Sequence, residues 1–179
     1  MNTTGTEPIP NQLLEQPGFT VEPALEAQVS ELLTHYPTKR SAALMVLHLF
    51  QERFGHISRQ AVEWIAAKLD LQPINIYELA TFYPMFQRNP VGKLHFRICR
   101  TLSCALGGSH QLHDYFCRKL GLDPQIHGPQ TTPDGKVTVE FVECLANCGK
   151  APVMMCNDAF YENVTEKTAG DLLARTRGA

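Results

Sequence analysis

Six cysteines all lie in the second half of the 179-residue chain, and four of them form two closely spaced pairs. Cys99 and Cys104 make a C-x4-C segment, whereas Cys144 and Cys148 make a C-x3-C segment. Thiolates are soft ligands that select zinc or iron–sulfur clusters over hard cations. The two pairs therefore predict one metal centre with four sulfur ligands.

The cysteine spacing does not identify the metal. Structural zinc sites favour spacings of about two to four residues, and a [2Fe–2S] cluster takes four cysteines, two for each iron. Neither the plant ferredoxin run C-x4-C-x2-C nor the Cys-His pairing of a Rieske site is present. By spacing alone a cluster and a zinc site are equally supported, and unlinked core thiols are a third, weaker interpretation.

Glycines beside the first pair favour a negatively charged centre. Gly107 and Gly108 precede a helix expected to begin at Ser109, which would place unpaired N–H groups and a positive helix end beside the sulfurs. Gly149 offers similar access beside the second pair. The alternative is that these glycines only permit turns.

The remaining candidate residues are assigned to structure rather than chemistry. Cys117 and Cys156 are expected to be buried thiols, because they lie within a predicted helix and a predicted strand. His110 and His113 share a helical face and are expected to be solvated. The absence of C-x-x-C, G-x-G-x-x-G, P-loop, G-x-S-x-G and H-E-x-x-H patterns disfavours dithiol exchange, nucleotide binding and hydrolysis on this chain.

Two strands are predicted to position the cysteine pairs. Apolar and polar residues alternate over 93–99, immediately before the first pair, and Val137, Val139 and Phe141 alternate before the second. If both strands belong to one sheet, the two loops emerge side by side and their sulfurs converge. A helix over 109–120, short strands near 130 and over 152–156 and 160–162, and a closing helix over 165–175 complete this half.

The first half has a different pattern. Apolar residues recur at helical spacing over 22–35, 41–54, 58 to about 72, and 75–83, with Pro73 expected to close the third helix. Residues 1–20 contain prolines and glycines but few core-forming side chains. The predicted fold class is α+β: a flexible leader over 1–20, a small helical bundle over 21–91 and an α/β domain over 92–179.

Composition excludes several function classes. The chain has 16 Lys+Arg against 18 Asp+Glu, a formal charge of −2, and only 19% charged residues, so a broad basic face for nucleic acid is not expected. No apolar run approaches the ~20 residues that cross a bilayer. Residues 1–16 carry no secretory signal pattern, so the thiols are expected to stay reduced.

Four motifs in order resemble the small [2Fe–2S] subunit of the peripheral arm of respiratory complex I. They are Ala-Thr-Phe-Tyr at 80–83, Pro-Val-Gly at 90–92, the C-x4-C pair followed by Gly-Gly-Ser at 107–109, and Glu-Cys-Leu-Ala-Asn-Cys at 143–148 followed by Ala-Pro-Val-Met-Met at 151–155. The resemblance covers about residues 21–177. The sequence departs from the commonest pattern at Ala146, where glycine is frequent, at Leu102-Ser103, where Thr-Pro occurs in some members, and at Cys156; none of these removes a ligand.

The resemblance implies a helical domain followed by a thioredoxin-like domain that holds one [2Fe–2S] cluster rather than zinc. Carried over by position, the ligands are Cys99, Cys104, Cys144 and Cys148. The family's cluster exchanges single electrons with FMN on a flavoprotein partner that also binds NADH, during NADH oxidation and quinone reduction.

The resemblance also implies an assembly. A larger iron–sulfur subunit is expected as a further partner, and the location is cytoplasmic, peripheral to the inner membrane of a bacterium, without membrane insertion by this chain. The active site of the complex would not be complete on this chain. Related subunits serve NAD-linked hydrogenases and formate dehydrogenases, which is one alternative; a structural zinc-binding interaction module is an alternative from another class.

Overall fold

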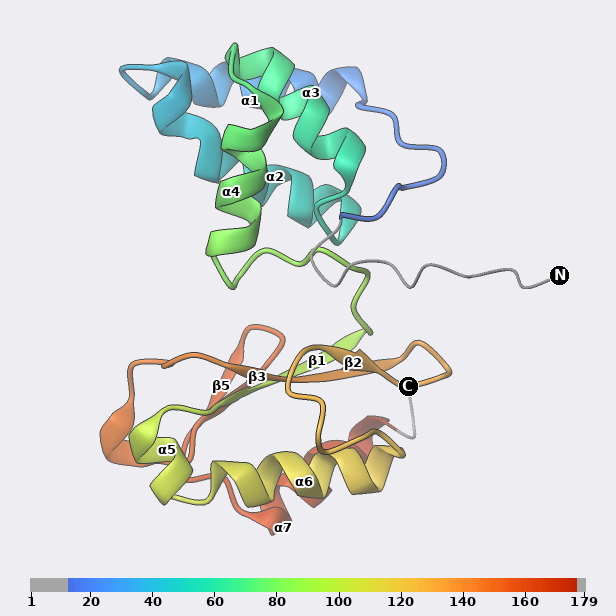
Figure 1. The fold of residues 1–179 in the computed structure, drawn as a ribbon, viewed down its shortest axis with the longest axis vertical. Helices are drawn as coiled ribbons and strands as arrows, with labels where there is room; N and C mark the ends of the chain where they lie inside the picture. The colour runs from blue at the N-terminus through green and yellow to red at the C-terminus, as the bar shows by residue number, and fades with distance from the viewer. Residues whose placement is uncertain (1–12, 177–179) are drawn as a thin grey trace, which may run out of the picture. The chain divides into compact units, whose positions relative to one another are not determined.

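A computed structural model describes residues 13–176 (Figure 1). The chain divides into two compact units, the first ending at Pro90 and the second beginning at Val91. The first is helical and the second contains a five-stranded sheet. This is the α+β organisation predicted from the two kinds of periodicity. No helix among the described residues is long and apolar enough to cross a membrane.

Within residues 13–90, the first unit consists of four helices and one 3-10 turn. They are α1 (Pro23–Thr34), η1 (Lys39–Ala42), α2 (Ala43–Phe54), α3 (Arg59–Leu69) and α4 (Pro73–Phe82). The Ser58 side chain accepts a hydrogen bond from the N–H of Ala61, 3.2 Å away, and so caps α3. Pro73 does not simply end the third helix; it lies in the first turn of α4, where its missing N–H costs nothing.

Residues 13–20 differ from the flexible leader predicted for them. The Gln16 N–H donates to the side-chain oxygen of Gln60 at 3.0 Å, and the Gln60 amide donates back to the Gln16 carbonyl at 3.3 Å. The Phe19 ring lies 5.0 Å from the ring of Phe54 and packs on the helical core. The packing of this half-buried ring favours a defined position despite the local excess of proline and glycine. Residues 1–12 lie outside the described part of the chain.

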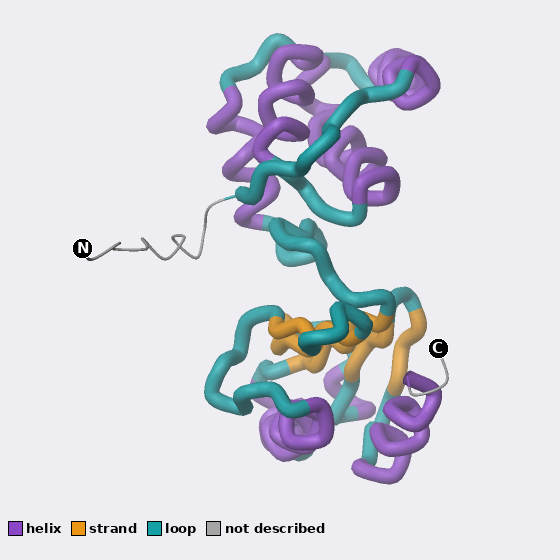
Figure 2. Tube along the Cα trace, turned by 90° about the vertical axis from the view of Figure 1, so that its right-hand side faces the viewer, coloured by secondary structure: helices purple, strands orange, loops and turns teal. Residues whose placement is uncertain are grey.

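The second unit is a mixed sheet covered on one face by two helices (Figures 1 and 2). The strands lie in the order β2-β3-β1-β4-β5, and α6 and α7 cover the same face. The elements are β1 (Leu94–Cys99), α5 (Leu102–Leu106), α6 (Ser109–Leu120), β2 (Gln130–Thr131), β3 (Val137–Val142), η2 (Cys148–Lys150), β4 (Met154–Cys156), β5 (Ala159–Tyr161) and α7 (Glu166–Thr176). The predicted strands and helices are present, but the short helix α5 is not among the predictions.

Alternate residues of strand β1 contribute side chains to the core. Phe96 and Ile98 are fully buried, and the Phe96 ring lies 4.7 Å from that of Phe116 on α6. Strand β1 pairs with β3 in parallel, and the register places Cys99 opposite Val142 at the ends of both strands. Parallel strands present their carboxyl ends at the same edge. The chain therefore leaves β1 and β3 side by side, immediately before the two cysteine loops.

Gly92 allows β1 and β3 to begin this pairing. A Cβ added at Gly92 would lie 2.6 Å from the backbone carbonyl carbon of Lys136 and 2.6 Å from the backbone nitrogen of Val137. The Gly92 N–H also donates to the Thr138 hydroxyl at 2.7 Å. Backbone atoms cannot give way as a flexible side chain can, so only glycine fits here.

Replacing Gly92 by alanine should therefore lower the free energy of unfolding by about 1–3 kcal/mol, the usual cost of overpacking. Urea unfolding of the full chain would measure the change. Gly128→Ala is the matched control, because its added Cβ meets nothing within 4 Å. Equal stabilities of the two variants would contradict the steric requirement at Gly92.

Candidate metal centre

The four predicted ligands lie on two segments at one end of the sheet. Cys99 is the last residue of β1 and Cys104 belongs to α5, and both are buried. Cys144 lies in the loop after β3 and Cys148 begins η2, and both are exposed. Helix α5 and the η2 turn are in contact at this end (Figure 1). The fold thus brings one buried and one exposed pair together.

The second pair has the spacing of two sulfurs on one metal atom. The Sγ atoms of Cys144 and Cys148 are 3.7 Å apart. Two thiolates each ~2.3 Å from a tetrahedral metal would be about 3.8 Å apart. This pair is therefore already arranged as a two-sulfur chelate.

Contacts between the two loops connect the pairs. The Thr101 hydroxyl lies 3.3 Å from the Cys99 Sγ, and Leu145 of the other loop packs against the buried Cys99 and Cys104. Arg100 donates through Nε to Glu143 at 3.0 Å, an exposed ion pair that joins the same two segments. The sequence prediction omits Thr101, although a hydroxyl inside the C-x4-C segment is a visible signal.

Hydrogen bonds favour thiolates at two of the four positions. Burial acts to raise the pKa of Cys99, but hydrogen bonds from the Thr101 hydroxyl and from the backbone of Leu145 lower it overall. The backbone N–H of Ala146, 3.3 Å from the Cys144 Sγ, lowers the pKa of Cys144, with Thr101 contributing next. Burial raises the pKa of Cys104 to about 11. A bound metal must therefore displace a proton that Cys104 holds firmly.

The arrangement is that of two pairs rather than one cage. Within residues 13–176, no three histidine, cysteine, aspartate or glutamate side chains are grouped to hold a single metal ion. A structural zinc site would need all four thiols on one ion, whereas a [2Fe–2S] cluster would take one pair on each iron.

Comparison with known proteins decides the family. Residues 29–177 match the family model described as thioredoxin-like [2Fe–2S] ferredoxin. The chain belongs to this family. The resemblance seen in the motifs, and the thioredoxin-like fold that it implies, are confirmed. Members of the thioredoxin-like [2Fe–2S] ferredoxin family are iron–sulfur proteins, which supports a cluster over zinc.

Subunits of NADH-quinone oxidoreductases match most of the chain. One from Rhizobium meliloti is 35% identical over 155 residues, covering 87% of this chain and 90% of the relative. NADH-quinone oxidoreductase subunit 2 of Thermus thermophilus is 38% identical over 152 residues, covering 83% of this chain and 82% of the relative. Both relatives belong to an oxidoreductase complex.

A solved structure shares the fold. The crystal structure of an NAD+-reducing [NiFe]-hydrogenase in the H2-reduced state matches with a TM-score of 0.65 and 19% identity over 76% of this chain. This chain spans 22% of that hydrogenase chain. At this identity the match supports the fold alone.

The glycines beside the first pair do not supply free donors, contrary to the expectation. The Gly107 N–H donates to the Ser103 carbonyl at 2.9 Å, and the Gly108 N–H donates to the Ala105 carbonyl at 3.2 Å. Both N–H groups take part in the hydrogen bonds of the turn that ends α5. The predictions do not include this helix. The interpretation that these glycines permit turns is the one that fits; Gly108 has φ 99°.

The other two cysteines lie apart from the candidate ligands. Cys117 is fully buried in α6, and burial raises its pKa to about 11. Cys156 is half-buried in β4 and packs against the core of the second unit. Cys117 is buried as predicted, whereas Cys156, predicted to be buried, is only half-buried.

The expectation of solvated histidines is wrong for His113. Its side chain is fully buried, and its ring stacks on Phe141 with centroids 4.1 Å apart. The His127 ring lies against the His113 ring, with centroids 5.9 Å apart. The Cys117 Sγ is 3.6 Å from Nε2 of His113. The register of β3 brings Phe141 under α6, a long-range contact that helical spacing alone does not reveal.

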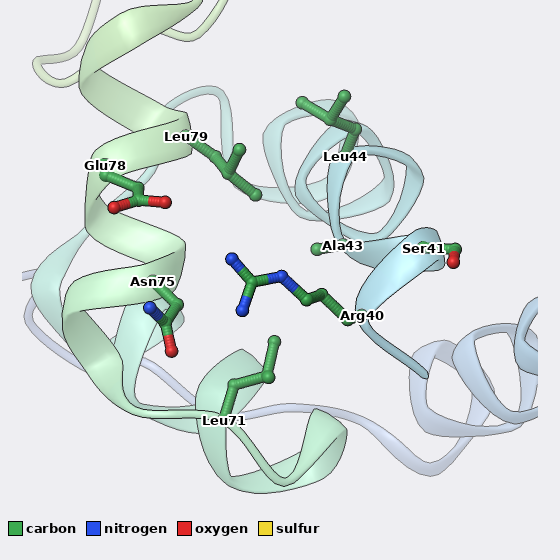
Figure 3. Close-up of a pocket in the computed structure, with 8 residues that line it drawn as sticks. All are labelled: Arg40, Ser41, Ala43, Leu44, Leu71, Asn75, Glu78 and Leu79. Atoms are coloured by element: carbon green, nitrogen blue, oxygen red, sulfur yellow. The ribbon is translucent and has the colours of Figure 1, made fainter. Parts of the chain in front are cut away.

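A pocket of about 120 Å³ lies in the helical unit (Figure 3). The Arg40 guanidinium extends into it, and Glu78 of α4 also lines it. The remaining lining residues are Ser41, Ala43, Leu44, Leu71, Asn75 and Leu79. The one cation and the one carboxylate leave this pocket without net charge, and none of its residues is a sulfur ligand. It has no part in the metal centre.

Ala146, where relatives of the resembled family often carry glycine, adopts a left-handed backbone with φ 61°. A side chain makes this conformation unfavourable, so Ala146→Gly should raise the free energy of unfolding by about 1 kcal/mol. Chemical denaturation of the full chain measures it. Ala151→Gly, at an ordinary φ of −64° nearby, should instead destabilise by roughly 0.5–1 kcal/mol. A destabilised Ala146→Gly variant would contradict this account.

His113 should make stability depend on pH. Burial lowers its pKa below 6.5, His127 and His110 act in the same direction, and Asp114 opposes them. The unfolded chain therefore takes up the proton first, so stability is complete above about pH 6.5 and falls as the pH decreases below it. His113→Phe, which preserves a stacking ring, should reduce the slope by up to about 1.4 kcal/mol per pH unit.

Denaturant unfolding at several pH values between about 5 and 7 measures this slope. His35→Gln, which alters an exposed histidine of the other unit, is the control and should leave the slope unchanged. An unaltered slope in His113→Phe would show that its protonation is not linked to folding.

Proposed function

We propose that this chain is an electron-transfer subunit whose Cys99, Cys104, Cys144 and Cys148 hold one [2Fe–2S] cluster. The observation that carries the proposal is the meeting of two cysteine pairs, from loops separated in sequence, in a member of the thioredoxin-like [2Fe–2S] ferredoxin family. A bound [2Fe–2S] cluster supplies a carrier for single electrons. Cys99 and Cys104 would hold one iron, and Cys144 and Cys148 the other.

The protein's own residues prepare this site in three ways. Val153 and Ala151 pack around the buried pair and exclude water from it. The N–H of Ala146 and the hydroxyl of Thr101 point hydrogen bonds at sulfur. The exposed pair lies at the surface, where another protein can approach the site closely.

The electron partner is a flavoprotein subunit that binds NADH and FMN, beside a larger iron–sulfur subunit of the same assembly. The names of the relatives, subunits of NADH-quinone oxidoreductase, support this assignment. The sequence contains no nucleotide-binding motif of its own, so the organic cofactors belong on the partner. The chain would then work during NADH oxidation and quinone reduction, as a cytoplasmic part of an assembly attached to the inner membrane.

An NAD-reducing hydrogenase is the second candidate host. Part of a solved NAD+-reducing [NiFe]-hydrogenase chain has the same fold. Purification of the tagged chain from its native cells distinguishes the two. Recovery with a quinone-reducing NADH dehydrogenase supports the first host, and recovery with a nickel-containing hydrogenase replaces it by the second.

The ligand assignment predicts the outcome of cysteine replacement. Cys148→Ser should reduce the iron content per chain about tenfold or more. Loss of a residue that only hydrogen-bonds to a metal ligand already reduces metal affinity about 10–100-fold, and loss of a ligand should cost at least as much. Cys156→Ser is the same chemical change at a half-buried thiol outside the site, and should retain the cluster. Iron and acid-labile sulfide per chain, with the visible spectrum, measure both.

Two results would reject this function. Colourless wild-type protein that contains stoichiometric zinc and no iron would identify the chain as a structural zinc module. Full cluster content in Cys148→Ser, or its loss in Cys156→Ser alone, would reject the assigned ligands without rejecting a cluster.

A further inference from the structure

Thr101 occupies a capping position without capping its helix. It is the N-cap residue of α5, with extended backbone angles of φ −74° and ψ 167°, yet its side chain makes no capping hydrogen bond. Threonine at an N-cap usually accepts from an N–H of the first turn, as Ser58 does at α3. The Thr101 hydroxyl is therefore directed elsewhere.

The Thr101 hydroxyl is directed at the sulfur of one proposed ligand. Its Oγ1 lies 3.3 Å from the Cys99 Sγ, a length suited to a hydrogen bond to sulfur. Cys99 is the last residue of β1, so the hydroxyl contacts the ligand that ends this strand.

We propose that Thr101 tunes the metal centre: its hydroxyl donates to the Cys99 sulfur and thereby raises the reduction potential of the cluster. This inference rests on the proposed function. A metal-bound thiolate carries no proton, so the hydroxyl is the donor in the loaded protein. A hydrogen bond to sulfur strengthens as the sulfur gains negative charge, and so favours the reduced state.

Two neighbouring arginines already have other partners. Arg100 is paired with Glu143, so its positive charge is largely neutralised beside the site. Arg97 donates to the Asn157 carbonyl at 2.6 Å. The Ala146 N–H also donates to sulfur, but it belongs to the main chain. Thr101 is thus a donor that a side-chain substitution can remove selectively.

The test compares Thr101→Val, which keeps the shape and removes the hydroxyl, with Thr101→Ser, which restores it. Ser103→Ala is the matched control, because it removes a hydroxyl of the same C-x4-C segment, on α5, for which no hydrogen bond to sulfur is found within residues 13–176. The readout is the midpoint potential of the cluster in the full chain, followed by visible absorption and electron paramagnetic resonance. Thr101→Val should lower the equilibrium constant for reduction about tenfold, which is 59 mV for one electron.

Thr101→Ser and Ser103→Ala should both remain near the wild-type potential. An unchanged potential in Thr101→Val with full cluster content overturns the proposal and leaves the proposed function intact. Loss of the cluster from both Thr101→Val and Thr101→Ala also overturns it, because Thr101 would then hold the loop rather than set the potential. A wild-type chain without iron would instead reject the proposed function itself.

Discussion

The parallel pairing of β1 with β3 is the constraint on which the rest of the second unit depends. The register that places Cys99 opposite Val142 brings two loops, distant in sequence, to one edge of the sheet. A one-residue slip would turn every side chain of the strand to the opposite face, removing Phe96 and Ile98 from the core. Burial of these residues against α6 therefore enforces the register, and the register enforces the meeting of the cysteines. At the opposite end of these strands, the close approach of Gly92 to the backbone of Lys136 and Val137 permits the same alignment.

The two cysteine pairs then experience different surroundings. Cys99 and Cys104 are held within a small apolar cluster with Val153, whereas Cys144 and Cys148 are exposed. Burial alone opposes ionisation of a thiol, and hydrogen bonds to sulfur offset it. The loop between Cys144 and Cys148 contributes to the burial of one pair and to the hydrogen bonding of the other. Leu145 packs on the buried pair, and the Ala146 N–H donates to Cys144 of the exposed pair. A site with one pair of sulfurs shielded from water and the other pair exposed to an approaching protein suits a centre that exchanges electrons with a partner.

Much of this arrangement could be predicted from sequence because it depends on local periodicity. Alternation located β1 and β3, helical spacing located the four helices of the first unit, and the cysteine pairs followed directly after strands. What sequence did not reveal depends on long-range contacts. Phe19 packs on α2 from within the segment predicted to be a leader, and His113 is buried because Phe141 of another element stacks on it. The donors to sulfur also escaped prediction, since they depend on α5 and on how the two loops face each other.

Ala146 shows how the energetics of the loop and of the sulfurs are connected. Its left-handed backbone costs about 1–2 kcal/mol for a residue with a side chain. Such strain persists only where the surroundings compensate for it. Here the strained residue is also the one whose N–H donates to Cys144. A hydrogen bond to a charged acceptor is roughly twice as strong as one between neutral groups. The loop conformation is therefore better compensated when Cys144 is a thiolate than when it is a thiol, so the state of the sulfur and the order of the loop stabilise each other.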